Sequence, residues 1–127
     1  MGESQLQGYP QGWSYSANWA IIHVVDIKVK PMLLDVLHTN KDRINALGSL
    51  YGARRIRVFG SVARREERPD SDVDFLVDFP IGYDMFTQRL ALADQLEILL
   101  ARRVEVIPEH ELNRHIKDRV IGEAVEL

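Results

Sequence analysis

The sequence contains no cysteine and no long apolar run. The lack of cysteine excludes disulfide bonds and thiolate metal sites, and it fits a reducing compartment. No apolar stretch approaches the roughly 18 residues that a membrane span needs, and the N-terminus lacks the basic start and apolar core of a secretory signal. The sequence therefore predicts a cytoplasmic protein without a membrane segment.

An excess of basic residues is also missing. The chain has 16 Lys and Arg residues against 19 Asp and Glu residues, which gives a net charge of −3. A dedicated nucleic-acid binder usually carries a strong positive excess, so we expect no direct nucleic-acid binding. Hydrophobic residues make up 46% of the 127 residues, which is enough for one modest core and not for two.

The chain divides into an N-terminal tail over residues 1–30 and a compact domain over residues 31–127. The tail is rich in Gly, Ser and Gln and has little to bury, although Val24–Val29 alternates in the manner of a strand. Within the domain, the patterns predict helices over 31–50, 84–101 and 109–125, and strands over 55–59, 73–79 and 103–107. This order predicts an α/β (α+β) fold, a small mixed sheet flanked by helices.

The apolar spacing also predicts which side of each later helix is buried. We expect the helix over 84–101, which Asp84 can cap, to bury Phe86, Leu90, Ala93, Leu96 and Leu100. We expect the last helix to bury Leu112, Ile116, Val120 and Ala124.

Two aspartates at the start of the second predicted strand, Asp72 directly before it and Asp74 within it, carry the predicted chemistry. Residues i and i+2 of a strand project from the same face, so Asp72 and Asp74 lie about 7 Å apart on one face. Their mutual repulsion is about 2 kcal/mol at an effective dielectric of about 20. A divalent cation removes this cost, and Mg²⁺ prefers carboxylate oxygens. Glu105 of the third strand completes this metal site if the two strands are neighbours.

A phosphate-binding turn is predicted just before these aspartates. Gly60 and Ser61 follow the first strand, where a glycine lets backbone N–H groups approach a phosphate and the serine hydroxyl adds a donor. Arg64 can neutralise a triphosphate oxygen. These parts match phosphoryl transfer with two metal ions about 3.5–4 Å apart.

Each of these features also has an ordinary structural interpretation. Asp72 and Asp74 could be solvated charges at a strand edge, and Glu105 could be an exposed strand residue. Arg64 could form a surface ion pair with Glu66 or Glu67. Taken together, in this order and spacing, the residues favour catalysis.

The pattern Gly60-Ser61-x10-Asp72-x-Asp74 resembles the signature of the DNA polymerase β-type nucleotidyltransferases. Gly60-Ser61-Val62-Ala63-Arg64 with Ser71-Asp72-Val73-Asp74 is most similar to the minimal nucleotidyltransferases, called MNT proteins. The resemblance implies that Ser61 contacts a triphosphate and that Asp72, Asp74 and Glu105 bind Mg²⁺. The family usually has an aspartate where this chain has Glu105.

MNT proteins are often paired with HEPN proteins as antitoxin and toxin. The resemblance therefore implies transfer of AMP from ATP to a tyrosine of a HEPN ribonuclease. A homo- or hetero-oligomer is compatible with the sequence. Two alternatives stay open. The chain could neutralise its HEPN partner by binding alone, or it could transfer a nucleotide to RNA or to a small molecule.

Overall fold

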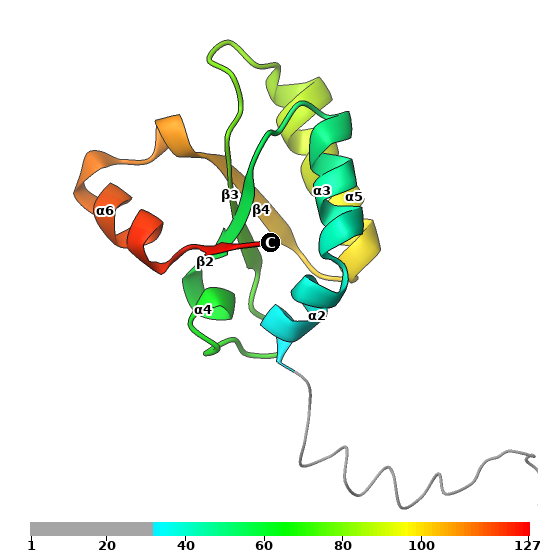
Figure 1. The fold of residues 1–127 in the computed structure, drawn as a ribbon, viewed down its shortest axis with the longest axis vertical. Helices are drawn as coiled ribbons and strands as arrows, with labels where there is room; N and C mark the ends of the chain where they lie inside the picture. The colour runs from blue at the N-terminus through cyan, green and yellow to red at the C-terminus, as the bar shows by residue number, and fades with distance from the viewer. Residues whose placement is uncertain (1–31) are drawn as a thin grey trace, which may run out of the picture. The chain divides into compact units, whose positions relative to one another are not determined.

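The computed structural model describes residues 32–127 (Figure 1). The predicted tail and its predicted strand over Val24–Val29 lie outside these residues. Among residues 32–127, no helix is long and apolar enough to cross a membrane.

A four-stranded mixed sheet forms the centre of the domain. Its order is β4-β3-β2-β5, with β3 and β4 parallel and the other two pairings antiparallel. The strands are β2 (Ile56–Phe59), β3 (Val73–Val77), β4 (Val104–Pro108) and β5 (Val125–Glu126). The first three begin and end within two residues of the predicted bounds, so the prediction of a small mixed sheet with helices is confirmed.

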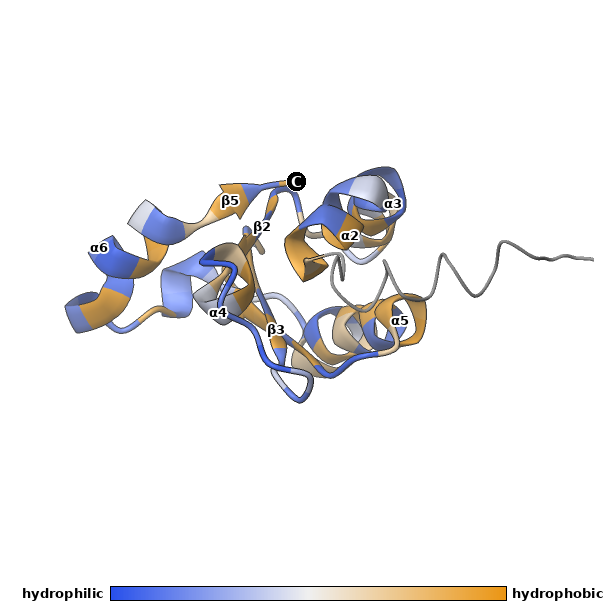
Figure 2. Cartoon of the chain, turned by 90° about the horizontal axis from the view of Figure 1, so that it is seen from below, coloured by the Kyte–Doolittle hydropathy of each residue, from blue (hydrophilic) through white to orange (hydrophobic). Residues whose placement is uncertain are grey.

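Helices lie on both sides of this sheet. Figures 1 and 2 place α2, α3 and α5 on one side and α6 on the other. The helical segments are α2 (Leu33–Thr39), α3 (Lys41–Leu50), α4 (Gly60–Ala63), the π-helix η1 (Met85–Leu90), α5 (Ala91–Leu100), the 3₁₀-helix η2 (Glu109–Glu111) and α6 (Arg114–Glu123). The apolar sides of α2, α3 and α5 turn toward the strands (Figure 2).

The hydrophobic core lies between the sheet and these three helices. Val58, Phe75 and Val106 come from the three central strands and are almost fully buried. Ile44 and Leu96 pack against them from α3 and α5. The alternation predicted for the second strand is confirmed for Val73, Phe75 and Val77, which join this core and leave Asp74 on the opposite face.

The first predicted helix is wrong in one respect, because it breaks into two at Asn40. Asn40 leaves the helical conformation, and its side chain donates to the Val36 carbonyl at 2.9 Å. The Thr39 hydroxyl donates to the Asp35 carbonyl at 3.0 Å. Side chains of this kind compete with the helical backbone for its own carbonyls, so the chain can bend here without losing hydrogen bonds.

The burial predicted for Phe86 and Leu90 is wrong. Phe86 is 76% exposed and Leu90 is 44% exposed, whereas Ala93 and Leu96 are buried as predicted. Both residues lie in the π-helix η1, which has more residues in each turn than an α-helix. The side chains of η1 are therefore rotated relative to the buried face of α5. Arg89 donates to the Val106 carbonyl at 2.6 Å, and Gln88 donates to the Tyr51 carbonyl at 3.0 Å. The side chains of Gln88 and Arg89 therefore point toward the domain, and those of Phe86 and Leu90 are left exposed.

The last predicted helix is too long at both ends. It divides into η2, then α6, then β5. The Asn113 side chain accepts from the His115 N–H at 2.8 Å and starts α6, as an N-cap does. After Ala124 the chain extends and pairs Val125 with Val58, because the edge of β2 offers unpaired backbone groups. Of the four residues predicted to be buried here, only Val120 is fully buried.

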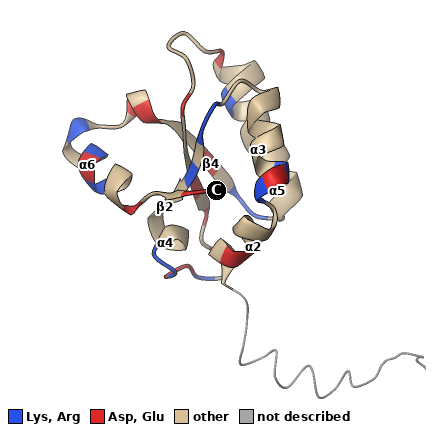
Figure 3. Cartoon of the chain, in the orientation of Figure 1, with Lys and Arg blue, Asp and Glu red and all other residues tan. Residues whose placement is uncertain are grey.

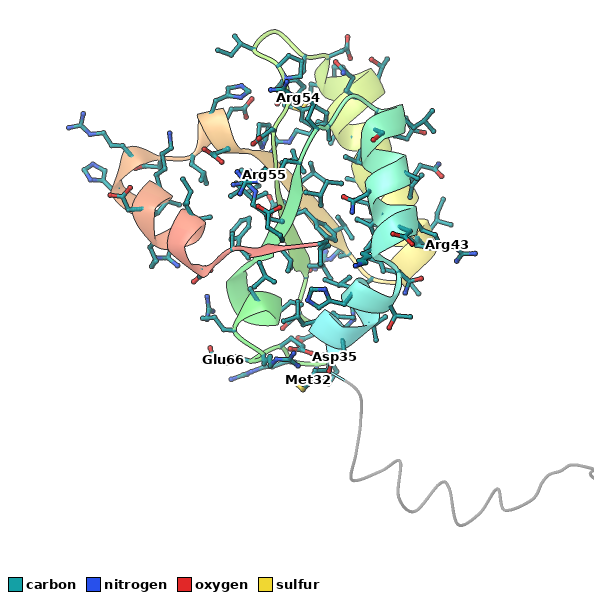
Figure 4. All side chains as sticks on the ribbon, viewed as in Figure 1. Met32, Asp35, Arg43, Arg54, Arg55 and Glu66 are labelled. Atoms are coloured by element: carbon teal, nitrogen blue, oxygen red, sulfur yellow. The ribbon has the colours of Figure 1, made fainter. Side chains whose placement is uncertain are left out.

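Arg57 is a buried charged residue of β2. Its side chain is only 3% exposed and forms ion pairs with Asp78 at 2.8 Å and Glu109 at 2.7 Å. Its neighbour Arg55, labelled in Figure 4, pairs with Glu126 at the surface. Arg57 within β2 and Arg55 directly before it therefore offer a buried and an exposed ion pair two residues apart.

We expect Arg57→Leu to lower the free energy of unfolding by about 3 kcal/mol, because it leaves two carboxylates facing each other without their buried cation. We expect Arg55→Leu to lower it by less than about 1 kcal/mol, because surface ion pairs contribute little. Urea denaturation of both variants measures the difference. Equal losses would contradict this assignment of the buried pair.

Candidate active site

The register of the sheet brings the predicted site residues into one row. Phe59, at the end of β2, lies opposite Asp74 in β3, and Asp74 lies opposite Glu105 in β4. Paired residues project from the same face, so the turn after Phe59, the Asp74 carboxylate and the Glu105 carboxylate are neighbours. The expectation that Glu105 shares the face of Asp74 is confirmed.

Gly60 begins the turn with a backbone that other residues rarely adopt. Its φ is +76°, and a Cβ at this position would lie 2.6 Å from Asp74 Oδ2. A larger residue would be strained and would collide with the carboxylate. The glycine therefore lets the Asp74 side chain approach the turn. The turn itself is helical, and α4 begins at Gly60.

The environment of Asp74 disfavours its charge. Burial, together with the neighbouring negative charges of Glu105 and Asp72, raises the pKa of this carboxyl from its ordinary 3.8 to about 6. The positive charge of Arg64 acts in the opposite direction. The positive charges of the chain therefore compensate only in part for the negative charge of an ionised Asp74.

Asp72 is turned toward a different partner. Its Oδ1 lies 3.3 Å from Nε of Arg103, which precedes β4. Over residues 32–127, no three carboxylate or imidazole side chains are gathered closely enough to hold a metal ion as they stand. The structure therefore brings Asp74 and Glu105 together, while Asp72 pairs with an exposed arginine. The oxygens of these carboxylates are nevertheless the kind of ligand that Mg²⁺ prefers, and a cation would stabilise the charged form of Asp74.

Arg64 ends the turn and takes part in two ion pairs. Its Nε lies 3.1 Å from Glu66, as one interpretation of the sequence predicts, and its Nη1 lies 3.2 Å from Glu123. Figure 3 shows basic and acidic residues following one another in this loop, and Figure 4 labels Glu66 beside Asp35 at the same end of the domain. Arg65 ties the loop to α2 through Asp35 at 3.0 Å.

Glu123 contacts the candidate site, which the sequence does not reveal. The Gly60 N–H donates to its Oε2 at 2.7 Å, so α6 reaches the beginning of the turn. In the sequence Glu123 resembles any solvated helix residue. The available signal is its spacing of three from Val120, which places both on one helix face. Since the Gly60 N–H is already bonded, Ser61 is the residue of the turn that remains for a phosphate.

A pocket of about 510 Å³ adjoins the Glu105 side of the row. Asp72 and Glu105 form its polar end. The rest of its lining combines apolar and basic side chains from η1, α5 and the outer edge of β4: Met85, Arg89, Leu90, Ala93, Arg103, Val104 and Val106. The pocket therefore opens directly onto two of the predicted ligands.

Residues 41–127 match the protein family described as "Nucleotidyltransferase domain". The chain belongs to this family. This nucleotidyltransferase is 40% identical over 75 residues to the protein adenylyltransferase MntA of Thermococcus cleftensis, covering 59% of this chain and 75% of that one. The enzyme class is thereby confirmed.

Solved structures support the same fold. One, provisionally described as a minimal nucleotidyltransferase, is 39% identical, covers 74% of this chain and 95% of its own, and has a TM-score of 0.66. A toxin–antitoxin structure with AMP-PNP is 21% identical, covers 68% of this chain and 71% of its own, and has a TM-score of 0.60. The polymerase β-like fold is confirmed, while the roles of the individual site residues stay predictions.

The raised pKa of Asp74 predicts how this site affects stability. Between about pH 4 and pH 6 the folded protein binds a proton at Asp74 more readily than the unfolded chain does. Stability contributed by this group is therefore lost as the pH rises through this window. We expect Asp74→Asn to be more stable than the wild type at pH 7.5, and the advantage to shrink toward pH 4.

Urea denaturation at both pH values, without divalent cations, measures this advantage. Asp94→Asn on α5 changes an exposed carboxylate and serves as the matched control. An advantage of the same size at both pH values would contradict the prediction.

Proposed function

We propose that this nucleotidyltransferase transfers AMP from ATP to a tyrosine hydroxyl of a HEPN ribonuclease toxin and so acts as its antitoxin. The main structural support for this proposal is the row formed by the Gly60–Ser61 turn, Asp74 and Glu105 at one end of the sheet. The adenylyltransferase name of its archaeal relative and the toxin–antitoxin assembly of its structural neighbour support the choice of acceptor.

The residues of the row divide the work of the reaction. Asp72, Asp74 and Glu105 would hold Mg²⁺ in the arrangement of two ions that the sequence predicts. When bound, Mg²⁺ neutralises the triphosphate and favours the deprotonated acceptor oxygen. Ser61 and Arg64 would donate to the triphosphate. The acceptor oxygen bonds to the α-phosphorus, the bond to the bridging oxygen of the β-phosphate breaks, and pyrophosphate leaves.

The requirement of in-line transfer favours one side of the row for the acceptor. The attacking and leaving oxygens lie on opposite sides of the phosphorus. With the triphosphate at the Gly60–Ser61 turn, as proposed, the acceptor would approach from the Glu105 side. The pocket beside Glu105 lies on this side, and its apolar lining from Met85, Leu90 and Ala93 suits an aromatic side chain of a protein.

Incubation of the chain with the HEPN protein proposed as its partner, Mg²⁺ and ATP labelled in the α-phosphate tests the proposal. We expect label on a HEPN tyrosine and a loss of about 100-fold or more in Asp72→Asn and Asp74→Asn, since each removes charge needed at the reacting phosphate. Asp70→Asn changes an exposed carboxylate near the row and should label normally. Absence of label with every divalent cation would contradict the proposal.

The same variants separate the alternatives. If the chain neutralises the toxin by binding alone, Asp72→Asn still protects cells although it transfers no label. If the acceptor is RNA or a small molecule, label appears there and not on the HEPN protein. The net charge of −3 makes RNA the least favoured acceptor.

Leu90→Glu tests the side from which the acceptor approaches. A charge in the pocket opposes docking of an apolar acceptor segment, and we expect the KM for the HEPN protein to rise about tenfold, or about 1.4 kcal/mol. Affinity for ATP should not change. Ile98→Glu, which is 74% exposed on α5 outside the pocket lining, is the matched control. Equal effects of the two variants would place the acceptor elsewhere.

A further inference from the structure

A single carboxylate from the C-terminal helix holds both ends of the turn that contains Ser61. The Gly60 N–H, at the start of α4, donates to Glu123 Oε2 at 2.7 Å. Nη1 of Arg64, which follows the last residue of α4, lies 3.2 Å from both oxygens of the same carboxylate. Ser61 lies between these two fixed points, three residues before Arg64.

These contacts differ from an ordinary surface ion pair. The Glu123 side chain is only 16% exposed, and both of its oxygens are used. Charge-assisted hydrogen bonds to a backbone N–H and a guanidinium are about twice as strong as neutral ones. Arg119, one turn earlier in α6, lies farther away at 3.7 Å. The short contacts of Glu123 are therefore the ones directed at the turn.

The helix that carries Glu123 is itself fixed to the sheet. Val120 of α6 is 1% exposed. The chain then enters β5, which pairs with β2, and the Asn45 side chain donates to the Leu127 carbonyl at 3.2 Å. Because β2 also leads into Gly60, both the turn and its support are attached to the same strand. Glu123 thus acts from a rigid base.

Arg64 can serve Glu123 and a nucleotide at the same time. A guanidinium has five N–H donors in a planar fork. The contacts with Glu66 and Glu123 use Nε and Nη1, which leaves donors for a phosphate oxygen. Holding one side of the guanidinium reduces the side-chain freedom that would be lost when a nucleotide binds.

We propose that Glu123 is a positioning residue for nucleotide binding: it fixes Gly60 and Arg64 so that the donors of the turn face the triphosphate before ATP arrives. This inference rests on the proposed assignment of the Gly60–Ser61 turn to the triphosphate. It makes the last helix, far from the Asp72–Asp74 motif in sequence, a determinant of ATP affinity.

Calorimetric titration with α,β-methylene ATP and Mg²⁺ tests the inference, because this analogue binds without being cleaved at the reacting bond. We expect Glu123→Ala to raise the Kd about tenfold, since both supports are lost. Glu123→Gln should raise it about threefold, because an amide oxygen still accepts from the Gly60 N–H but no longer attracts Arg64. Arg119→Ala, which leaves both short contacts intact, should bind as the wild type does.

Thermal unfolding of the same proteins separates positioning from stability. If Glu123→Ala melts at a lower temperature but its folded form binds the analogue like the wild type, Glu123 is only structural and the inference is overturned. Tighter binding by either Glu123 variant would also overturn it, because Glu123 would then compete with the triphosphate for Arg64.

Ser61→Ala shows which proposal has failed. If Ser61→Ala weakens binding and Glu123→Ala does not, the positioning inference alone is wrong. If both variants bind like the wild type, the assignment of the turn to the triphosphate is wrong, and the inference falls with it.

Discussion

The crowding of carboxylates at one end of the sheet is the constraint on which the rest of the structure depends. Strand pairing alone places Asp74 beside Glu105, because β3 and β4 are parallel and in this register. The core residues Val73, Phe75, Val104 and Val106 fix that register from the other face, since a slip of one residue would expose them. Hydrophobic burial on one face thus imposes electrostatic repulsion on the other.

The opposite end of the same face shows that the chain can neutralise such a pair. Asp78 and Glu109 follow the same two strands, and the buried Arg57 reaches both within 2.8 Å. Within residues 32–127, no lysine or arginine comes within salt-bridge distance of Asp74 or Glu105. One end is neutralised by an internal arginine, whereas the other lacks such a partner, as the proposed binding of a cation and a triphosphate requires. The contrast is the strongest structural argument that the row is a ligand site.

The sequence predicts the parts of the fold that follow from local periodicity. Apolar and polar residues alternate with a period of two in the strand around Asp72 and Asp74, and the turn at Gly60 follows a short apolar strand. Both could therefore be placed from the sequence alone. The resemblance to nucleotidyltransferases rested on these segments. Glu105 could be placed on the correct face because Val104 and Val106 define the core side of its strand.

The missed features depend on contacts between distant segments. The outward rotation of Phe86 and Leu90 results from the anchoring of Gln88 and Arg89 to backbone carbonyls of other elements. The C-terminal strand β5 forms because the edge of β2 is open, and it cannot be predicted from Val125 and its sequence neighbours alone. Arg57 resembles the exposed arginines around it, and only the positions of Asp78 and Glu109 explain its burial.

Dependence on distant contacts has a functional consequence for α4. A helix of four residues cannot be stable by its own hydrogen bonds, because forming the first turn costs more than it returns. Its geometry must come from what surrounds it: the end of β2, the side chain of Asp74 packed against Gly60, and Glu123 from α6. The motif Gly60-Ser61 therefore specifies a turn only when the C-terminal segment is in place. In this domain the geometry proposed to bind phosphate is a property of the completed sheet, and the signature residues are held in position only within it.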